Sequence, residues 1–176
     1  MGNNVTIGFS TTNKLISSFI REITKSPCSH AWIAFDSIDL ETRVVVQAEW
    51  YGYEIIPLWR WRRNNILVAE FEPITIDLNP SLPRLAQYLG AKYDYEAAIL
   101  SGLFPYFTEY MKRYLKSNFK DPSKLMCAES VIRLLQPRCD CVKDLDPELT
   151  TPKELLDTLF STQEFKCIYK NPNFIK

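Results

Sequence analysis

The order of apolar and polar residues changes character near the middle of the chain. In the first half, short runs rich in β-branched and aromatic residues alternate apolar and polar side chains, as half-buried β-strands do. The strands predicted from these runs cover residues 5–10, 30–36, 43–50, 53–57 and 66–71. Because the last four follow one another with short connections, we expect antiparallel pairing.

In the second half, apolar residues recur every three or four positions, which is typical of helices packed on a core. A capping box at Thr151-Pro152-Lys153-Glu154 marks one helix start, and Pro137 forces an earlier helix to end. The predicted helices cover residues 15–23, 82–89, 95–119 with an interruption at 102–105, 126–136 and 151–160, and a final strand covers 165–169. We therefore expect an α+β fold, an antiparallel sheet of about five strands packed against helices.

The composition favours one domain, residues 1–176, because the chain is 176 residues long, 46% hydrophobic and without repeats or a linker. Lys plus Arg equal Asp plus Glu at 21 each, which gives no reason to expect a nucleic acid or an anionic membrane as partner. No apolar run approaches the ~20 residues of a membrane-spanning helix, and the start lacks a secretory signal pattern. We expect a cytoplasmic protein with no stable membrane insertion; the sequence leaves its oligomeric state open.

The candidate chemistry comes from one cysteine and the single histidine. The five cysteines, an odd number without an export signal, are expected to be free thiols. Cys127 falls in the first turn of a predicted helix, where backbone N–H groups favour a thiolate. His30 opens a predicted strand, and only this imidazole is available as a base. Gln47 and Glu49, on one face of the neighbouring strand, are both candidates to orient its second ring nitrogen.

Five short motifs together resemble the circularly permuted branch of the NlpC-like papain-fold cysteine hydrolases, in which the histidine strand precedes the nucleophile helix. They cover most of the chain. The motifs are Ser29-His30-Ala31-Trp32-Ile33-Ala34, Val46-Gln47-Ala48, Gly90-Ala91-Lys92-Tyr93-Asp94, Cys127-Ala128-Glu129-Ser130-Val131 and Thr151-Pro152-Lys153-Glu154-Leu155.

The resemblance implies a permuted papain-like fold and cysteine-dependent acyl transfer without a cofactor. It implies Cys127 as nucleophile, His30 as base, Gln47 or Glu49 as third residue and Tyr93 as a helper near the oxyanion. Relatives act on amide or ester bonds, so the implied substrate is a peptide, an isopeptide or a lipid ester. Two positions depart from the family pattern: Ala128 replaces a frequent Ser, and Gln47 stands where many relatives carry Glu.

Three other features have simpler interpretations. Cys28 lies two residues before His30, so we expect it on the same strand in a structural role. Cys139-Asp140-Cys141 and one histidine do not complete a zinc site without distant cysteines, so no metal is expected. Trp59-Arg60-Trp61-Arg62-Arg63 is interpreted as a charged edge strand with Trp packing the core. The alternative is that this basic-aromatic patch binds a partner in a catalytically silent module.

Overall fold

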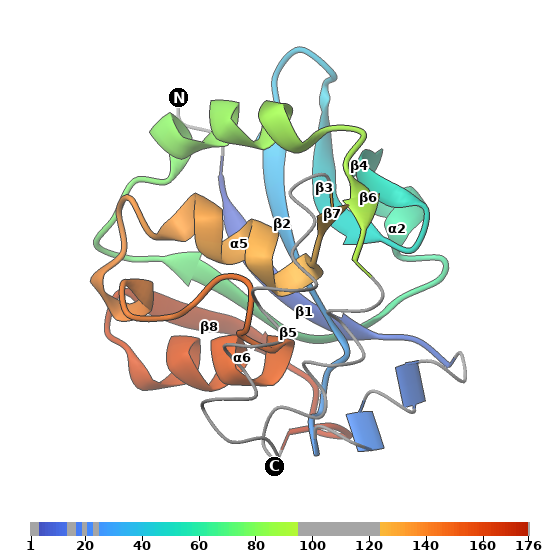
Figure 1. Ribbon diagram of the computed structural model, residues 1–176, viewed down its shortest axis with the longest axis vertical. Helices are drawn as coiled ribbons and strands as arrows, with labels where there is room; N and C mark the ends of the chain where they lie inside the picture. The colour runs from blue at the N-terminus through green and yellow to red at the C-terminus, as the bar shows by residue number, and fades with distance from the viewer. Residues whose placement is uncertain (1–3, 14–16, 19–20, 23–24, 95–123, 176) are drawn as a thin grey trace.

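The computed structural model describes residues 4–13, 17–18, 21–22, 25–94 and 124–175 (Figure 1). The helix expected over 95–119 lies outside the described residues, as do parts of the helix expected over 15–23. In the described part, the fold is α+β: helices pack on a six-stranded antiparallel sheet. The strands are β1 Thr6–Thr11, β2 His30–Ser37, β3 Thr42–Glu49, β4 Gly52–Pro57, β5 Ile66–Pro73 and β8 Phe165–Lys170.

The sheet order is β4-β3-β2-β1-β5-β8. The expected antiparallel pairing is confirmed, and the sheet has six strands instead of about five because the last strand of the chain joins β5. The sequential pairing of four strands is wrong at one step. β5 pairs with β1 and not with β4. After the edge strand β4, the chain returns to the middle of the sheet and β5 pairs with the side of β1 that β2 does not occupy. Consecutive strands are often neighbours in a sheet, but a longer connection permits this crossing.

Two helices lie on one side of the sheet (Figure 1): α5 Cys127–Leu135 and α6 Pro152–Ser161. Both were expected within one or two residues of these bounds. The helix expected over 82–89 is instead a 3-10 helix, η1 Asn79–Tyr88, with Pro83 inside it. Proline has no N–H to donate to the preceding turn, which disfavours a regular α-helix there. A second short 3-10 helix, η3, covers Asp140–Val142.

A small parallel pair of strands, β6 Lys92–Tyr93 and β7 Lys124–Leu125, lies beside the main sheet and leads directly into α5. The Tyr53 N–H donates to the Ala91 carbonyl at 2.9 Å, which ties the chain before β6 to β4. The start of α5 is therefore fixed next to β3 and β4.

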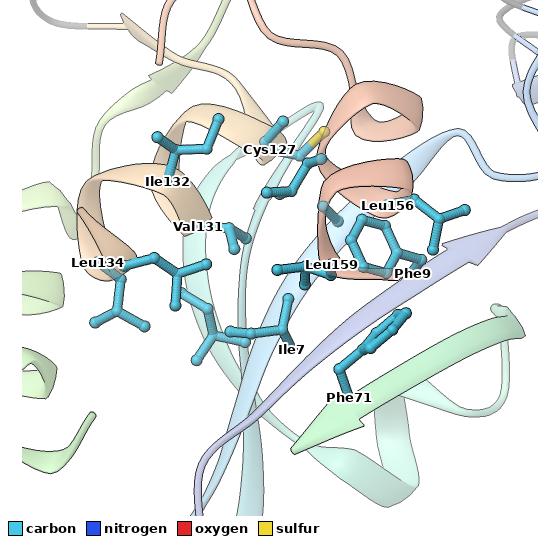
Figure 2. Packing of buried hydrophobic residues seen from close by; sticks show 14 of the residues in the cluster. Ile7, Phe9, Phe71, Cys127, Val131, Ile132, Leu134, Leu156 and Leu159 are labelled. Atoms are coloured by element: carbon cyan, nitrogen blue, oxygen red, sulfur yellow. The ribbon is translucent and has the colours of Figure 1, made fainter. Parts of the chain in front are cut away.

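The large core lies between the sheet and α5, α6 and η1. Alternate residues of β2, Ala31 and Ile33, point into it, together with Val46 and Ala48 of β3. Figure 2 shows Val131, Ile132 and Leu134 of α5 and Leu156 and Leu159 of α6 packed over Ile7 and Phe9 of β1 and Phe71 of β5.

A smaller apolar cluster covers the opposite face of the sheet. It contains Trp32 and Ala34 of β2, Val45 of β3 and Trp61, with the two tryptophan rings 4.7 Å apart. Gly8 of β1 lies directly opposite Trp32, and a Cβ built on Gly8 would be 2.0 Å from the indole. Glycine is required here because the Trp32 ring occupies the space of a side chain.

The Trp59–Arg63 segment forms the short helix α2 Leu58–Trp61 and a turn, so the expected edge strand is wrong. Pro57 is the last residue of β4 and, with extended backbone, the N-cap of α2. The chain then folds back over the sheet. The expected Trp packing is confirmed for Trp61, which is 2% exposed, whereas Trp59 is 57% exposed. Within the described ranges, no helix has the length and apolar character needed to cross a membrane.

Candidate active site

Cys127 is the first residue of α5 and is 4% exposed (Figure 2). Met126 before it has extended backbone and serves as N-cap, and its N–H donates to the Glu129 carboxylate at 3.2 Å. Arg133 one turn later holds the same carboxylate at 2.7 Å. The start of α5 is thus closed by a side chain from its own first turn, and the Ala128 N–H of that turn donates to the sulfur.

His30 is the first residue of β2, and its side chain is 12% exposed. At this end β2 pairs with β1 through Ser10↔His30, but its pairing with β3 begins only at Ile33↔Val46. β2 and β3 therefore separate over residues 30–32. The Cys127 sulfur lies at this end of β2, where it accepts hydrogen bonds from the backbone N–H groups of Ala31 and Ala128.

The His30 ring and the Cys127 sulfur are joined by a hydrogen bond, as the sequence predicts for the pair. Burial alone raises the pKa of the thiol, but the neighbouring imidazolium and the hydrogen bonds to the sulfur lower the pKa below its ordinary value. Burial disfavours the charged imidazole, yet the Cys127 thiolate, with Glu49 and Gln47, raises the pKa of His30 to about 9. Both shifts favour a thiolate–imidazolium pair at neutral pH.

The orienting position, which the sequence leaves open between two residues, is resolved by distance. Gln47 Oε1 lies 3.1 Å from His30 Nε2, within hydrogen-bond range. Glu49 Oε1 lies 3.9 Å from the same nitrogen, too far for a hydrogen bond but close enough to stabilise its positive charge. Since Nε2 is directed at Gln47, Nδ1 is the nitrogen left to face the sulfur.

Tyr93, the predicted helper, has its backbone in β6, but its side chain lies outside the described part of the chain. Two neighbours of Gln47 were missed: Trp61 Nε1 donates to Gln47 Oε1 at 3.0 Å, and Gln47 Nε2 donates to Glu54 Oε1 at 2.8 Å. The alternation of β4 could have placed Glu54 near Gln47 once the hairpin was predicted. No sequence signal placed Trp61 there, because its segment was interpreted as a strand.

The other cysteines have surroundings that keep them protonated. Cys28 is buried and precedes β2 instead of lying on it, and burial raises the pKa of its thiol to about 12. Burial also raises the pKa values of Cys139 and Cys167, and burial with the adjacent Glu164 raises that of Cys141 to about 12. Among the cysteines, all of which are described, Cys127 alone has a lowered pKa. The described residues contain no group of three or more His, Cys, Asp or Glu placed to hold a metal ion.

Comparison with known proteins supports the fold and does not assign a family. No protein-family model and no curated protein matches the sequence. Among solved structures, the chain is similar to the metalloprotein yiiX (DUF1105) from Escherichia coli O157:H7, with a TM-score of 0.59 over 97% of both chains. Their sequence identity is 13%, so the likeness concerns the fold alone.

Proposed function

We propose that this chain is a cysteine-dependent hydrolase that cleaves an amide or ester bond through a thioester, on a fold related to the permuted papain-like enzymes. The contact between Cys127 and His30, with the thiol pKa lowered and the imidazole pKa raised, is the observation that carries the proposal. A buried thiol without such a partner has its pKa raised, as at Cys28. The pair therefore has the protonation states that nucleophilic catalysis needs.

In the proposed mechanism, the Cys127 thiolate attacks the substrate carbonyl carbon and forms a tetrahedral intermediate. N–H groups at the start of α5 stabilise the oxyanion, with Tyr93 proposed as a helper. The intermediate collapses as the imidazolium of His30 gives its proton to the leaving amine or alcohol. Water then attacks the thioester while His30 takes a proton from it, and the thiolate leaves as the acid product forms.

The chemistry admits a peptide, an isopeptide or a lipid ester as substrate. We propose no cofactor, because the thiol, the imidazole and water complete the reaction. The five free thiols also support a reducing compartment such as the cytoplasm, where unpaired cysteines persist.

The test is intact-mass trapping of an acyl-enzyme with a panel of activated peptide, isopeptide and lipid-ester substrates. We expect an adduct on Cys127, and Cys127→Ala to lower turnover at least ~10³-fold. Cys167→Ala is the matched control and should leave turnover unchanged. If iodoacetamide at pH 7 labels Cys127 no faster than Cys167, and no substrate of the panel gives an adduct, the proposal is wrong.

A second candidate function is a catalytically silent module that binds a partner through the basic-aromatic patch of Trp59–Arg63. The supporting observation is the exposed Trp59, over whose ring the Arg63 guanidinium lies at 4.9 Å. This function predicts that Trp59→Ala abolishes partner binding while Cys127→Ala does not. The hydrolase proposal predicts that only the Cys127 variant loses acyl-enzyme formation.

A further inference from the structure

The amide of Gln47 is held in one orientation from both ends. The Trp61 indole N–H is only a donor, and it lies 3.0 Å from Gln47 Oε1. The Glu54 carboxylate is an acceptor, and Gln47 Nε2 donates to it at 2.8 Å. Rotating the amide by 180° would place its NH₂ against the indole N–H and its oxygen against the carboxylate, so both contacts would become repulsive.

Glu54 is itself held in place. Its Oε1 also accepts a hydrogen bond from the Tyr51 hydroxyl at 2.8 Å. Burial and this carboxylate together raise the pKa of the Tyr51 hydroxyl well above its ordinary value, so the phenol remains a donor. Gln47 is 1% exposed, so water does not compete effectively for its amide.

The fixed amide determines which nitrogen of His30 carries a proton. Gln47 Oε1, at 3.1 Å from His30 Nε2, is an acceptor, so Nε2 must be the donor in this contact. A neutral imidazole has a single N–H, and with that proton on Nε2 the lone pair is on Nδ1, which faces Cys127. This is the tautomer that a base for the thiol requires.

We propose that Trp61 and Glu54 are positioning residues, which lock the Gln47 amide and thereby select the Nε2–H tautomer of His30 for proton transfer with Cys127. The inference rests on the proposed function where it makes His30 the base of the thiol. The proton position itself is measurable without any turnover. Neither residue touches the sulfur, so both act through Gln47.

The chain offers a direct readout because His30 is its single histidine. In a Cys127→Ala background the thiolate is absent. At a pH above the pKa of His30, the neutral ring is observed by long-range ¹H–¹⁵N NMR. We expect one tautomer with Nε2 protonated. In the same background, Glu54→Gln with Trp61→Phe should bring the two ring ¹⁵N shifts closer together, as tautomers mix. A protonated Nδ1 in the parent, or unchanged shifts in the folded combined variant, would overturn the proposal.

Trp32→Phe is the matched control. Trp32 packs against Trp61 in the same cluster, but its indole N–H has no hydrogen-bond partner among the described residues. This substitution removes the same group of atoms without touching Gln47, so the tautomer should remain Nε2–H. If Trp32→Phe mixes the tautomers as much as the combined variant does, loss of packing and not loss of the hydrogen bonds to Gln47 is responsible.

If the combined variant does not fold, the two single variants decide. Trp61→Phe and Glu54→Gln each remove one of the two contacts that fix the Gln47 amide, so each should bring the two ring ¹⁵N shifts closer together by a smaller amount. Unchanged shifts in both folded single variants would overturn the proposal.

With Cys127 intact, the iodoacetamide labelling rate at pH 7 gives the chemical consequence. Glu54→Gln with Trp61→Phe should slow labelling of Cys127 at least ~10-fold, because a His30 with the wrong tautomer does not take the thiol proton. Trp32→Phe should stay within about 2-fold of the parent. If labelling of Cys127 slows in the combined variant but no substrate of the panel forms an acyl-enzyme, the hydrolase proposal is wrong and the tautomer assignment is unaffected.

Discussion

At the scale of single residues, Cys127 and His30 each set the protonation of the other. The thiolate is the largest cause that raises the pKa of His30, and burial opposes it. We therefore expect Cys127→Ala to lower the pKa of His30 from about 9 to its ordinary value near 6.5 or below. NMR titration of the ring measures this. A pKa that stays near 9 would show that the sulfur is not the charged partner, and Cys167→Ala serves as control.

The pH dependence that we expect for the proposed hydrolase follows from the same pair. At low pH its rate should fall as the Cys127 thiol is protonated, and the lowered thiol pKa should extend activity below pH 9.0, the ordinary value for cysteine. At high pH its rate should fall near pH 9, where the imidazolium of His30 loses the proton that it would give to the leaving group.

Glu49→Gln tests the alkaline limb. The Glu49 carboxylate raises the pKa of His30 through its charge, so removing this charge should move the alkaline limb of kcat/KM to lower pH. Glu72→Gln is the control, because Glu72 pairs with Lys166 at the other end of the sheet. Coincident profiles for Glu49→Gln and the parent would contradict the assigned charge contact.

The sequence predicted much of the site at this scale because residue type restricts it. A single histidine and one cysteine at a helix start left few combinations. Gln47 and Glu49 were not separable, since alternation places both on one face of β3. Only the course of β2 beside β3 brings one of them within 3.1 Å of the imidazole.

At the scale of elements, local signals were reliable where a helix carries its own cap. Thr151 Oγ1 accepts from the Glu154 N–H at 3.2 Å, and the Glu154 carboxylate accepts from the Thr151 N–H at 2.7 Å. The predicted capping box at the start of α6 is therefore confirmed. Among the elements missed, α2 has only four residues, and its conformation depends on what it packs against. The 3-10 geometry of η1 was missed although Pro83 lies within it.

We expect Thr151→Ala to lower the free energy of unfolding by about 1 kcal/mol, because the Glu154 N–H loses its acceptor, the Thr151 hydroxyl, and the Glu154 carboxylate loses that hydroxyl as a donor. Thr158→Ala is the control. Thr158 lies within the same helix and bonds the Glu154 carbonyl at 2.8 Å, and alanine is the better helix former, so the change should stay within about 0.5 kcal/mol. Urea denaturation of both variants measures the difference, and equal losses would contradict the cap.

At the scale of the whole molecule, the sheet has an apolar cluster on each face, and the central strand β1 contacts both. Ile7 and Phe9 lie in the large core, and Gly8 contacts Trp32 on the opposite face. Gly8→Ala puts a methyl group 2.0 Å from the Trp32 ring, and neither the strand nor the buried indole has room to move. We expect a loss of about 3 kcal/mol in the free energy of unfolding. Thermal or urea denaturation measures it.

The rescue is Trp32→Phe. Two of the three nearest indole atoms, Cζ2 and Cη2, lie farther from Cβ than any atom of a phenylalanine ring. Gly8→Ala with Trp32→Phe should therefore cost less than the sum of the two single changes. Additive losses would show that the crowding at Gly8 is not with Trp32.

Strand order was the part of the fold that the sequence predicted least. Alternation identifies strands and their faces, but it does not say which edges meet. β8 joins β5 from the opposite end of the chain, and β5 bypasses β4 to reach β1. These pairings depend on long-range packing of α5 and α6, which local patterns do not encode.

The separation of β2 from β3 at residues 30–32 has a consequence for how tolerant the site is to substitution. One of the groups that hold the sulfur is main-chain, the amide of residue 31, and every amino acid except proline supplies it. The chemistry of the side chain at this position therefore does not affect how the Cys127 sulfur is held, but its size does, since Ala31 is fully buried. In saturation mutagenesis of residue 31, we expect the reactivity of Cys127 to decrease as side-chain volume increases. Gly and Ser should retain it, Pro should abolish it, and bulky residues should prevent folding.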